Sequence, residues 1–172
     1  AFVTMVARNV DALKKAAAAQ PTRSVMFAWF GGGDRWNPTI RNADAKLLRD
    51  ANGRNPFEEP DDRRRDSFNQ VSTEELIARG KNVDCWIIRD THSLPFRDVA
   101  TLRRFKAYRD GCLFAADGMF KPAADAFELY DLGTIRPDLV LGDIVRMLHP
   151  ALRDRSEEHT SELQSRLHLV CR

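Results

Sequence analysis

Apolar positions in the first thirty residues follow two spacings, and each spacing predicts one kind of element. Steps of three and four residues separate the apolar side chains that open the chain, which are Val3, Val6, Val10 and Leu13. This is the spacing of one helix face, so we expect a helix that ends before Pro21. Residues 25–30, VMFAWF, are unbroken apolar positions, and Gly31–Gly33 follow them. Such a run predicts a strand buried on both faces of a parallel sheet.

The rest of the chain continues this alternation as far as Pro150. Ser72 and Glu75 form a capping box that opens one helix, and Pro137 stands at the start of the last one. The remaining predicted elements are a helix over 43–51, a brief strand over 55–57, a helix over 72–78, a strand over 83–88, a helix over 98–105, a strand over 112–115 and a helix from 137 to Pro150. Alternating strands and helices predict right-handed crossovers and hence an α/β fold, a parallel sheet flanked by helices.

Size and charge exclude several classes of protein. The 172 residues suffice for one ordinary domain but would cramp two. Hydrophobic residues make up 43% and charged residues 30%, as in soluble globular proteins, and the formal net charge of +2 gives no support to nucleic-acid binding. No run approaches the roughly 18 apolar residues of a membrane span, and the first residues lack a signal peptide's features. We therefore interpret the chain as a fragment of a soluble protein.

Ligands of such sheets bind outside the carboxyl ends of the strands, so the candidate site lies in the loops after residues 30, 57, 88 and 115. Gly31–Gly33 would suit a phosphate loop, but neither GxGxxG nor Gly-Lys-Ser/Thr is present, and a turn is the preferred interpretation. Trp36, in the polar segment that follows, has no apolar neighbours in sequence. Its alternatives are stacking on a ligand and peripheral packing, and we treat it as a candidate ligand contact.

Further candidates lie later in the chain. Arg89 can offer a guanidinium fork to a carboxylate, phosphate or catecholate-like oxygen, with a structural salt bridge as the alternative. His92 lies between Asp90 and Ser93, but the GxSxG elbow of a hydrolase is absent, so we expect no catalytic residue here. Tyr130, before Gly133, offers ring surface. We expect Trp36, Arg89, His92 and Tyr130 to face one ligand cleft, without a metal ligand or a cofactor.

The cysteines and one histidine have structural interpretations. Cys85, Cys112 and Cys171 are too irregularly spaced for a zinc ribbon or a disulfide framework. Cys85 and Cys112 lie in two predicted strands and are interpreted as buried free thiols, with a disulfide as the alternative. His149 is expected to contact the last carbonyls of the helix that it ends.

The C-terminal segment differs from the rest. Residues 155–165, RSEEHTSELQS, follow Asp154 without a turn signal or a periodic apolar face. They resemble the in-frame translation of a widely used sequencing adapter, whereas the alternative is a natural helical tail capped by Ser156. We expect residues 155–172 to be a non-native tail that packs nowhere in the fold.

The order of motifs in the second half carries a family resemblance. A strand of the type VDxWI (83–87), a helix ending in RFKAYRDGCLF (104–114) and then GTIRPDLVLGDIVRMLHPAL (133–152) follow one another. This order resembles the C-terminal lobe of periplasmic substrate-binding proteins of iron-complex ABC importers. The FGGGDRW loop and the turn Asp50-Ala51-Asn52-Gly53, in place of the usual DAGG, extend the resemblance to about residues 8–153.

The resemblance implies a bilobed protein that binds its ligand in a cleft between lobes joined by a long rigid helix. Residues 1–20 would be the end of that helix and residues 21–154 the C-terminal ligand-binding lobe. The cargo would be an iron–siderophore complex, haem or cobalamin, and the partner an ABC transporter permease. The protein would be periplasmic or extracytoplasmic, held to a membrane only by that permease or by a lipid anchor on a missing N-terminus. The alternative is an α/β enzyme that acts on a small anionic substrate through Arg89 and His92.

Overall fold

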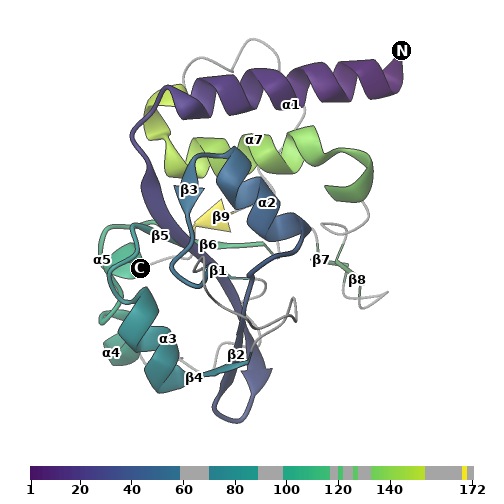
Figure 1. Cartoon of the computed structure of the whole chain (residues 1–172). Helices are drawn as coiled ribbons and strands as arrows, with labels where there is room; N and C mark the ends of the chain where they lie inside the picture. The colour runs from purple at the N-terminus through teal and green to yellow at the C-terminus, as the bar shows by residue number, and fades with distance from the viewer. Residues whose placement is uncertain are drawn as a thin grey trace.

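The computed structural model describes residues 1–58, 70–88, 99–116, 120–121, 126–127, 133–153 and 168–169. A sheet lies between two layers of helices (Figure 1). The helices are α1 (Phe2–Ala18), α2 (Ala43–Asp50), α3 (Thr73–Gly80), α4 (Val99–Leu102), α5 (Lys106–Arg109) and α7 (Pro137–Leu148), followed by a 3₁₀ turn at Pro150–Leu152. The strands are β1 (Arg23–Gly32), β2 (Arg35–Pro38), β3 (Gly53–Arg54), β4 (Val71–Ser72), β5 (Cys85–Ile88), β6 (Leu113–Ala115), β7 (Phe120–Lys121), β8 (Ala126–Phe127) and β9 (His168–Leu169).

The sheet has the order β4-β2-β1-β5-β6-β9, and β3 also pairs with β1. The pairs β1–β3, β1–β5 and β5–β6 are parallel, which confirms the α/β class. The pairs β1–β2, β2–β4 and β6–β9 are antiparallel, so the sheet is mixed rather than wholly parallel. Strand β1 is the central element, because its first half pairs with β3 and β5 and its second half pairs with β2.

Strand β1 is buried on both faces, as its unbroken apolar run predicts. Val25 and Phe27 belong to the core under α1, α2 and α7, whereas Met26 and Ala28 belong to the core under α3, α4 and α5. Successive side chains of a strand point to opposite faces, so one run of apolar residues supplies both cores.

Helix α1 is joined to the rest of the fold by apolar packing and by polar contacts at its middle and just beyond its C-terminal end. Its buried residues, Val6 and Ala17, face α7 and the core. The Asn9 side chain donates to Asp138 Oδ2 at 2.9 Å, and Asn52 Nδ2 donates to the carbonyl of Gln20 at 2.8 Å. Burial alone would raise the pKa of Asp138, but the hydrogen bonds that it accepts hold that pKa below its usual value.

Several predicted elements agree with the structure, and others shift. The Ser72 hydroxyl accepts from the Glu75 amide at 3.1 Å and caps α3, as the capping box predicts. The strand expected over 55–57 is wrong, because pairing with β1 takes place at residues 53–54 and Pro56 follows. The single helix expected over 98–105 is in fact the two short helices α4 and α5, with Phe105 fully buried between them.

Gly32 and Gly33 form a turn, which agrees with the preferred interpretation of the three glycines. Their φ angles are 92° and 63°, in the left-handed region that glycine enters without steric cost. The turn joins β1 to β2, which the sequence did not predict. Strand β2 was missed because its residues read as a polar loop that ends in Pro38.

The expectation that residues 155–172 pack nowhere is wrong at two positions. Residues 168 and 169 form β9, which pairs antiparallel with Ala115 and Phe114 of β6. Among the described strands, β5 pairs with one side of β6 and β9 with the other, where β6 presents backbone groups that an extended segment can pair with. No helix within the described ranges is both long and apolar enough to cross a membrane.

Candidate functional site

The carboxyl edge of the sheet, formed by the ends of β1, β5 and β6, is the place where this architecture binds ligands. Strand β5 ends at Ile88 and β6 at Ala115, and their last residues are paired with each other. Three of the predicted ligand contacts, Arg89, His92 and Tyr130, lie outside the described residues.

Trp36, the fourth candidate, is a core residue in the described structure. It lies in β2 with no exposed surface, and its indole N–H donates to the Thr73 hydroxyl at 3.1 Å. Its ring packs edge-on against Phe30 and Trp86, with centroids 5.5 and 5.7 Å away. A stacking role would need an accessible ring face, so the structure corrects the placement of Trp36 in a loop. Its apolar neighbours come from other strands and from the far side of the turn.

Trp29 is the aromatic residue at the carboxyl edge that the sequence analysis missed. It is partly exposed, and its ring lies edge-on to Phe27 with centroids 6.3 Å apart. Phe27 pairs with Ile87, so Trp29 lies one step beyond Ile88, the last residue of β5. The signal was present in the sequence, since Trp29 is the next-to-last residue of the apolar run, but an unbroken run does not show which positions reach the edge.

Polar side chains of β2 share a face with Trp29. Asn37 lies opposite Trp29 in the β1–β2 ladder, and directly opposed residues point to the same face. The Thr39 amide donates to the Phe27 carbonyl at 2.8 Å, so Thr39 continues that face. The Thr39 hydroxyl is buried and makes no hydrogen bond within the described residues. A buried hydroxyl without a hydrogen-bond partner is rare, so this part of the sheet has an unused capacity for a hydrogen bond.

A small hollow lies between α2, α7 and the sheet on the same side as Phe27. Its described lining residues are Phe27, Asp44, Leu47, Ile87, Ala116, Val140 and Ile144. Asp44 is the one polar side chain among the described lining residues, which otherwise offer dispersion contacts. Trp36, the predicted ligand contact that lies within the described residues, does not line it.

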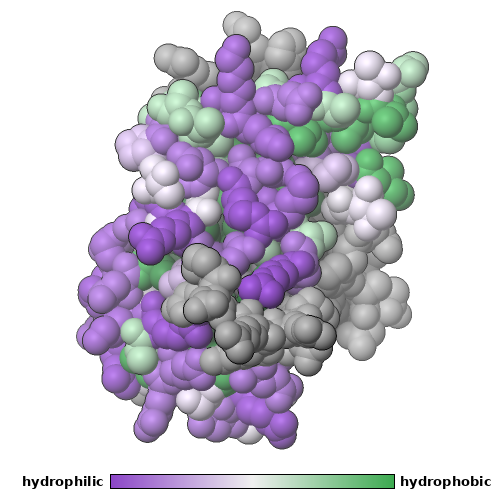
Figure 2. All heavy atoms as spheres, in the orientation of Figure 1, coloured by the Kyte–Doolittle hydropathy of each residue, from purple (hydrophilic) through white to green (hydrophobic). Residues whose placement is uncertain are grey.

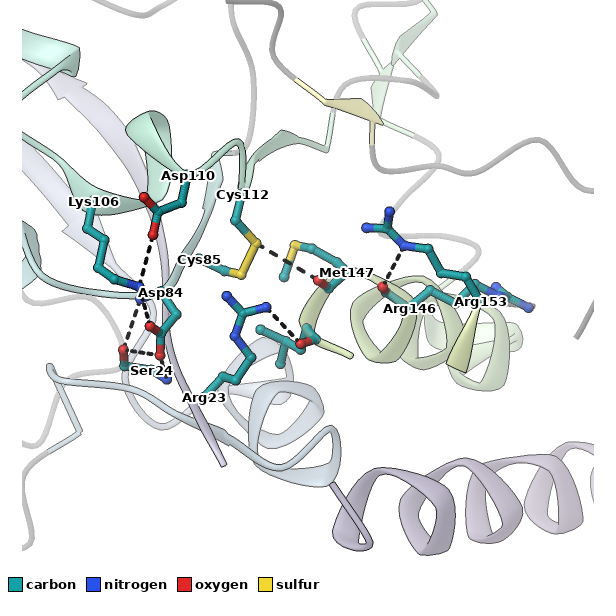
Figure 3. The surroundings of a disulfide bond; sticks show 11 residues. Arg23, Ser24, Asp84, Cys85, Lys106, Asp110, Cys112, Arg146, Met147 and Arg153 are labelled. Carbon is teal, nitrogen blue, oxygen red and sulfur yellow. Dashed lines mark hydrogen bonds and ion pairs between the residues drawn. A yellow bond between two sulfur atoms is a disulfide. The ribbon is translucent and has the colours of Figure 1, made fainter. Parts of the chain in front are cut away.

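The amino-terminal end of the strands is covalently fastened (Figure 3). Cys85 and Cys112 form a disulfide with Cα atoms 4.7 Å apart, which corrects their interpretation as free thiols. The register pairs Trp86 with Leu113, so the residues before them in these parallel strands lie side by side. Spacing in the sequence alone does not reveal this register. The Met147 carbonyl of α7 lies 3.9 Å from the Cys112 sulfur, so the bridge packs under that helix.

A charged network lies beside the disulfide (Figure 3). The Asp84 carboxylate accepts hydrogen bonds from the Ser24 amide at 2.8 Å, the Ser24 hydroxyl at 2.9 Å and the Lys106 ammonium at 2.6 Å. Partial burial alone would raise the pKa of Asp84, but the Lys106 and Ser24 hydrogen bonds outweigh it and lower the pKa to about 2. Lys106, also paired with Asp110, has a raised pKa, first because of its hydrogen bond to Asp84. The network ties β1, β5 and α5 together and is structural.

His149 ends α7 and also links that helix to the end of α2. Its Nε2 lies 2.8 Å from the carbonyl of Ala51, just after α2, and this nitrogen must carry the proton because a carbonyl can only accept. The expected contact with the last carbonyls of its own helix is made by the backbone, because the His149 amide donates to the Val145 carbonyl at 2.8 Å, and the side chain adds a contact to the end of α2. No cluster of three or more His, Cys, Asp or Glu residues suited to a metal ion occurs in the part of the chain that the structure describes.

Comparisons with known proteins identify the fold. No protein-family model and no curated protein sequence matches the chain. Among solved structures, it is similar to an ABC transporter substrate-binding protein from Listeria monocytogenes, with 15% identity and a TM-score of 0.61 over 87% of this chain and 56% of that one. A periplasmic vitamin B12-binding protein of Vibrio cholerae has 13% identity and a TM-score of 0.59 over 85% of this chain and 51% of that one. A periplasmic haem-binding protein from Roseiflexus sp. RS-1 has 22% identity and a TM-score of 0.62 over 88% and 56%.

The chain therefore spans about half the length of these proteins while almost all of it takes part in the match. At this level of identity the likeness concerns the fold and not the ligand. The fold is that of a single lobe of an ABC-type substrate-binding protein, as the motif order of the sequence implies.

Proposed function

We propose that this chain is the C-terminal lobe of the solute-binding component of an ABC importer, and that the whole protein captures an iron–siderophore complex, haem or cobalamin without chemical turnover. The observation that carries the proposal is the match of nearly the whole chain to about half of each of several such proteins, among them haem-binding and vitamin B12-binding proteins.

The disulfide supports an extracytoplasmic location. Structural disulfides persist in oxidising compartments such as the periplasm and are rare in the reducing cytosol. The Cys85–Cys112 bridge is buried in the sheet, with 0% and 7% of the two residues exposed, so it belongs to the core rather than to a surface redox site. A periplasmic or extracytoplasmic protein that delivers its cargo to a permease would keep this bond.

Exposed apolar surface around the start of α1 supports a second lobe. Phe2, Val3 and Ile135 are 51%, 78% and 61% exposed, and hydrophobic residues gather near the N-terminal end of α1 in Figure 2. The Arg136 guanidinium lies 5.8 Å from the centre of the Phe2 ring, so α1 and the residues before α7 contribute to one surface. Exposed apolar patches of this kind mark interaction sites, and we assign this one to the other lobe. Residues 1–20 are then the end of the interlobe helix.

The ligand would lie at the carboxyl edge of the lobe 21–154. We propose that Arg89, His92 and Tyr130 contact it there, with Arg89 donating paired hydrogen bonds to metal-bound oxygens. Residues 155–172 are proposed to be a non-native tail, of which residues 168–169 pair with the edge of β6.

The test uses the two-lobed protein expressed from its complete gene. Calorimetric titration with a ferric siderophore, haemin and cyanocobalamin should give saturable one-to-one binding to at least one of them, and the ligand should be recovered unchanged. The isolated chain should bind more weakly than micromolar, because half of the contacts are absent. Arg89→Ala should weaken binding by roughly 1.5–3 kcal/mol with stability nearly unchanged. Conversion of the ligand, or unaltered affinity with a large stability loss, would contradict the proposal.

A further inference from the structure

We infer that four exposed cations around the turn between α4 and α5 form a surface that binds the anionic headgroups of a phospholipid membrane. The cations are Lys81, Arg103, Arg104 and Arg109, and we call their surface the basic face. The inference goes beyond the proposed capture of a ligand, because the basic face lies away from the carboxyl edge and needs no ligand to act.

Backbone carbonyls of this region bring the four side chains together. The Lys106 amide donates to the Lys81 carbonyl at 2.8 Å, so the end of α3 lies against the start of α5. The Arg109 guanidinium donates to the carbonyls of Arg103 and Arg104 at 2.9 and 3.2 Å, which holds it over the turn between α4 and α5. The basic face therefore combines the ends of three helices that cover the same side of the sheet (Figure 1).

The positive charge of the basic face is not neutralised by its described neighbours. Asp84 and Asp110 both form ion pairs with Lys106, with N–O distances of 2.6 and 3.1 Å (Figure 3). Within the described residues, no ion pair joins a carboxylate to a cation of the basic face. With Lys106 included, five cations and two carboxylates give this cluster a net charge of +3, compared with +2 for the whole chain.

The arrangement of these cations favours an extended anionic surface over a small anion. Small ligands bind in concave sites where a few polar groups converge. The four side chains are instead exposed and come from the ends of three helices, so they present separate charges over an area. A membrane offers many phosphates in one plane, and each basic residue close to an anionic membrane strengthens the attraction.

The basic face offers charge without apolar or aromatic contact. Phe2, Val3 and Ile135, the large hydrophobic residues exposed in the described chain, belong to α1 and to the residues before α7. Phe105 and Tyr108, the aromatic residues of this segment, pack into the core under α3, α4 and α5. Membrane-inserting helices add apolar contacts, and proteins that bind single-stranded nucleic acid add aromatic stacking. We therefore expect electrostatic contact at the membrane surface that salt reverses.

The basic face and the carboxyl edge lie at different ends of the sheet. Lys106 pairs with Asp84, which directly precedes β5, so the basic face lies near the amino-terminal end of that strand. The proposed ligand contacts follow Ile88, at the other end of β5. Contact with lipid through the basic face therefore leaves the proposed ligand edge accessible.

The experiment measures co-sedimentation of the chain with sucrose-loaded vesicles, without any ligand. One set of vesicles is phosphatidylcholine alone, and the other holds equal parts of phosphatidylcholine and phosphatidylglycerol. The test variant is Arg103→Gln, Arg104→Gln. The matched control is Arg8→Gln, Lys15→Gln, which removes the same charge from exposed positions of α1, a helix that packs on the other core. These four side chains form no ion pair with another described residue, so both variants should keep the parent's melting temperature.

We expect the chain to bind the anionic vesicles at low salt and to be released at about 0.5 M salt, where the Debye length is only about 4 Å. The test variant should lower the partition coefficient roughly 25-fold, or about fivefold for each cation removed, and the control should lower it less than about threefold. Failure to bind the anionic vesicles, equal binding to both sets or an equal loss in both variants would overturn the inference.

A DNA duplex at the same phosphate concentration separates lipid from nucleic acid. Weaker binding to the duplex than to the anionic vesicles supports the membrane as the partner. Tighter binding to the duplex would assign the basic face to nucleic acid and overturn the inference. Neither result bears on the capture of a ligand, which calorimetry of the two-lobed protein tests separately.

Discussion

Breaking the Cys85–Cys112 bond should destabilise the lobe substantially, because the bond closes a long loop of the unfolded chain. The two residues are 27 positions apart in sequence. A cross-link over this distance lowers the entropy of the unfolded chain enough to stabilise the fold by about 3.5 kcal/mol at 25 °C. For a domain of this size, the loss corresponds to a fall of about 10 °C in melting temperature.

The measurement is urea unfolding followed by tryptophan fluorescence. The protein carries Cys171→Ser, so that Cys85 and Cys112 are the only cysteines left. Denatured oxidised protein should contain no free thiol, and reduced protein should contain two. The reduced protein keeps both sulfur atoms, so its loss of stability isolates the covalent bond. The double variant Cys85→Ala, Cys112→Ala should also be less stable than the oxidised protein, and reductant should not change its unfolding midpoint.

Equal stability of oxidised and reduced protein, within about 0.5 kcal/mol, would refute the reasoning. It would mean that the unfolded chain already keeps these residues together or that the folded bridge is under compensating strain. Two free thiols in denatured protein that was never exposed to reductant would refute the bond itself. The support that the disulfide gives to an extracytoplasmic location would then be lost.

The remaining predictions concern three other features of the fold. Hydrogen bonds in the folded state lower the pKa of Asp84 to about 2. The ionised Asp84 therefore stabilises the fold above the unfolded pKa near 3.9, and this stabilisation disappears as the pH falls through 2. Asp84→Asn should reduce the free energy of unfolding at neutral pH, and acid unfolding curves of the variant should show a smaller decrease of stability with falling pH. Gly53→Ala should lower the free energy of unfolding in urea by roughly 1–3 kcal/mol, because the new Cβ would lie 2.6 Å from Val25 Cγ1. Gly133→Ala is the control and should be nearly neutral, because its Cβ would lie 3.7 Å from the nearest atom. Removal of residues 155–172 should change the free energy of unfolding by less than about 1 kcal/mol, because within the described residues this tail adds only two paired residues to the sheet. A larger loss would indicate that the tail is a native segment.

Local signals in the sequence predict the elements that depend on local chemistry. The capping box of Ser72 needs only the amide three residues later, and Pro137 at the first position of α7 needs only its own fixed φ angle. Both elements form as predicted. The apolar run of β1 likewise predicts a strand buried on both sides, because its pattern does not depend on which elements cover it.

Long-range contacts decide what the sequence leaves open. Trp36 is buried because β2 folds back on β1 and brings the ring against Trp86, fifty residues away in sequence. Cys85 and Cys112 pair because of the register between two strands, which no single stretch of sequence encodes. In both cases the sequence supplies the residue type, and the topology decides whether the residue lies in the core, in a covalent bond or at an edge of the sheet.

The two ends of the sheet therefore differ in how firmly they are fastened. Near the amino-terminal end, the disulfide, the Asp84–Lys106 pair and the bond from Arg23 to the carbonyl of Leu148 fasten β1, β5, α5 and α7 to one another. At the carboxyl edge, β1 ends in a glycine turn and Trp29 keeps part of its ring exposed. A binding lobe needs a fixed frame behind an adaptable edge, because rigid support lets a few contacts set affinity. Changes at the first end should therefore alter unfolding and leave the proposed ligand binding of the two-lobed protein nearly intact.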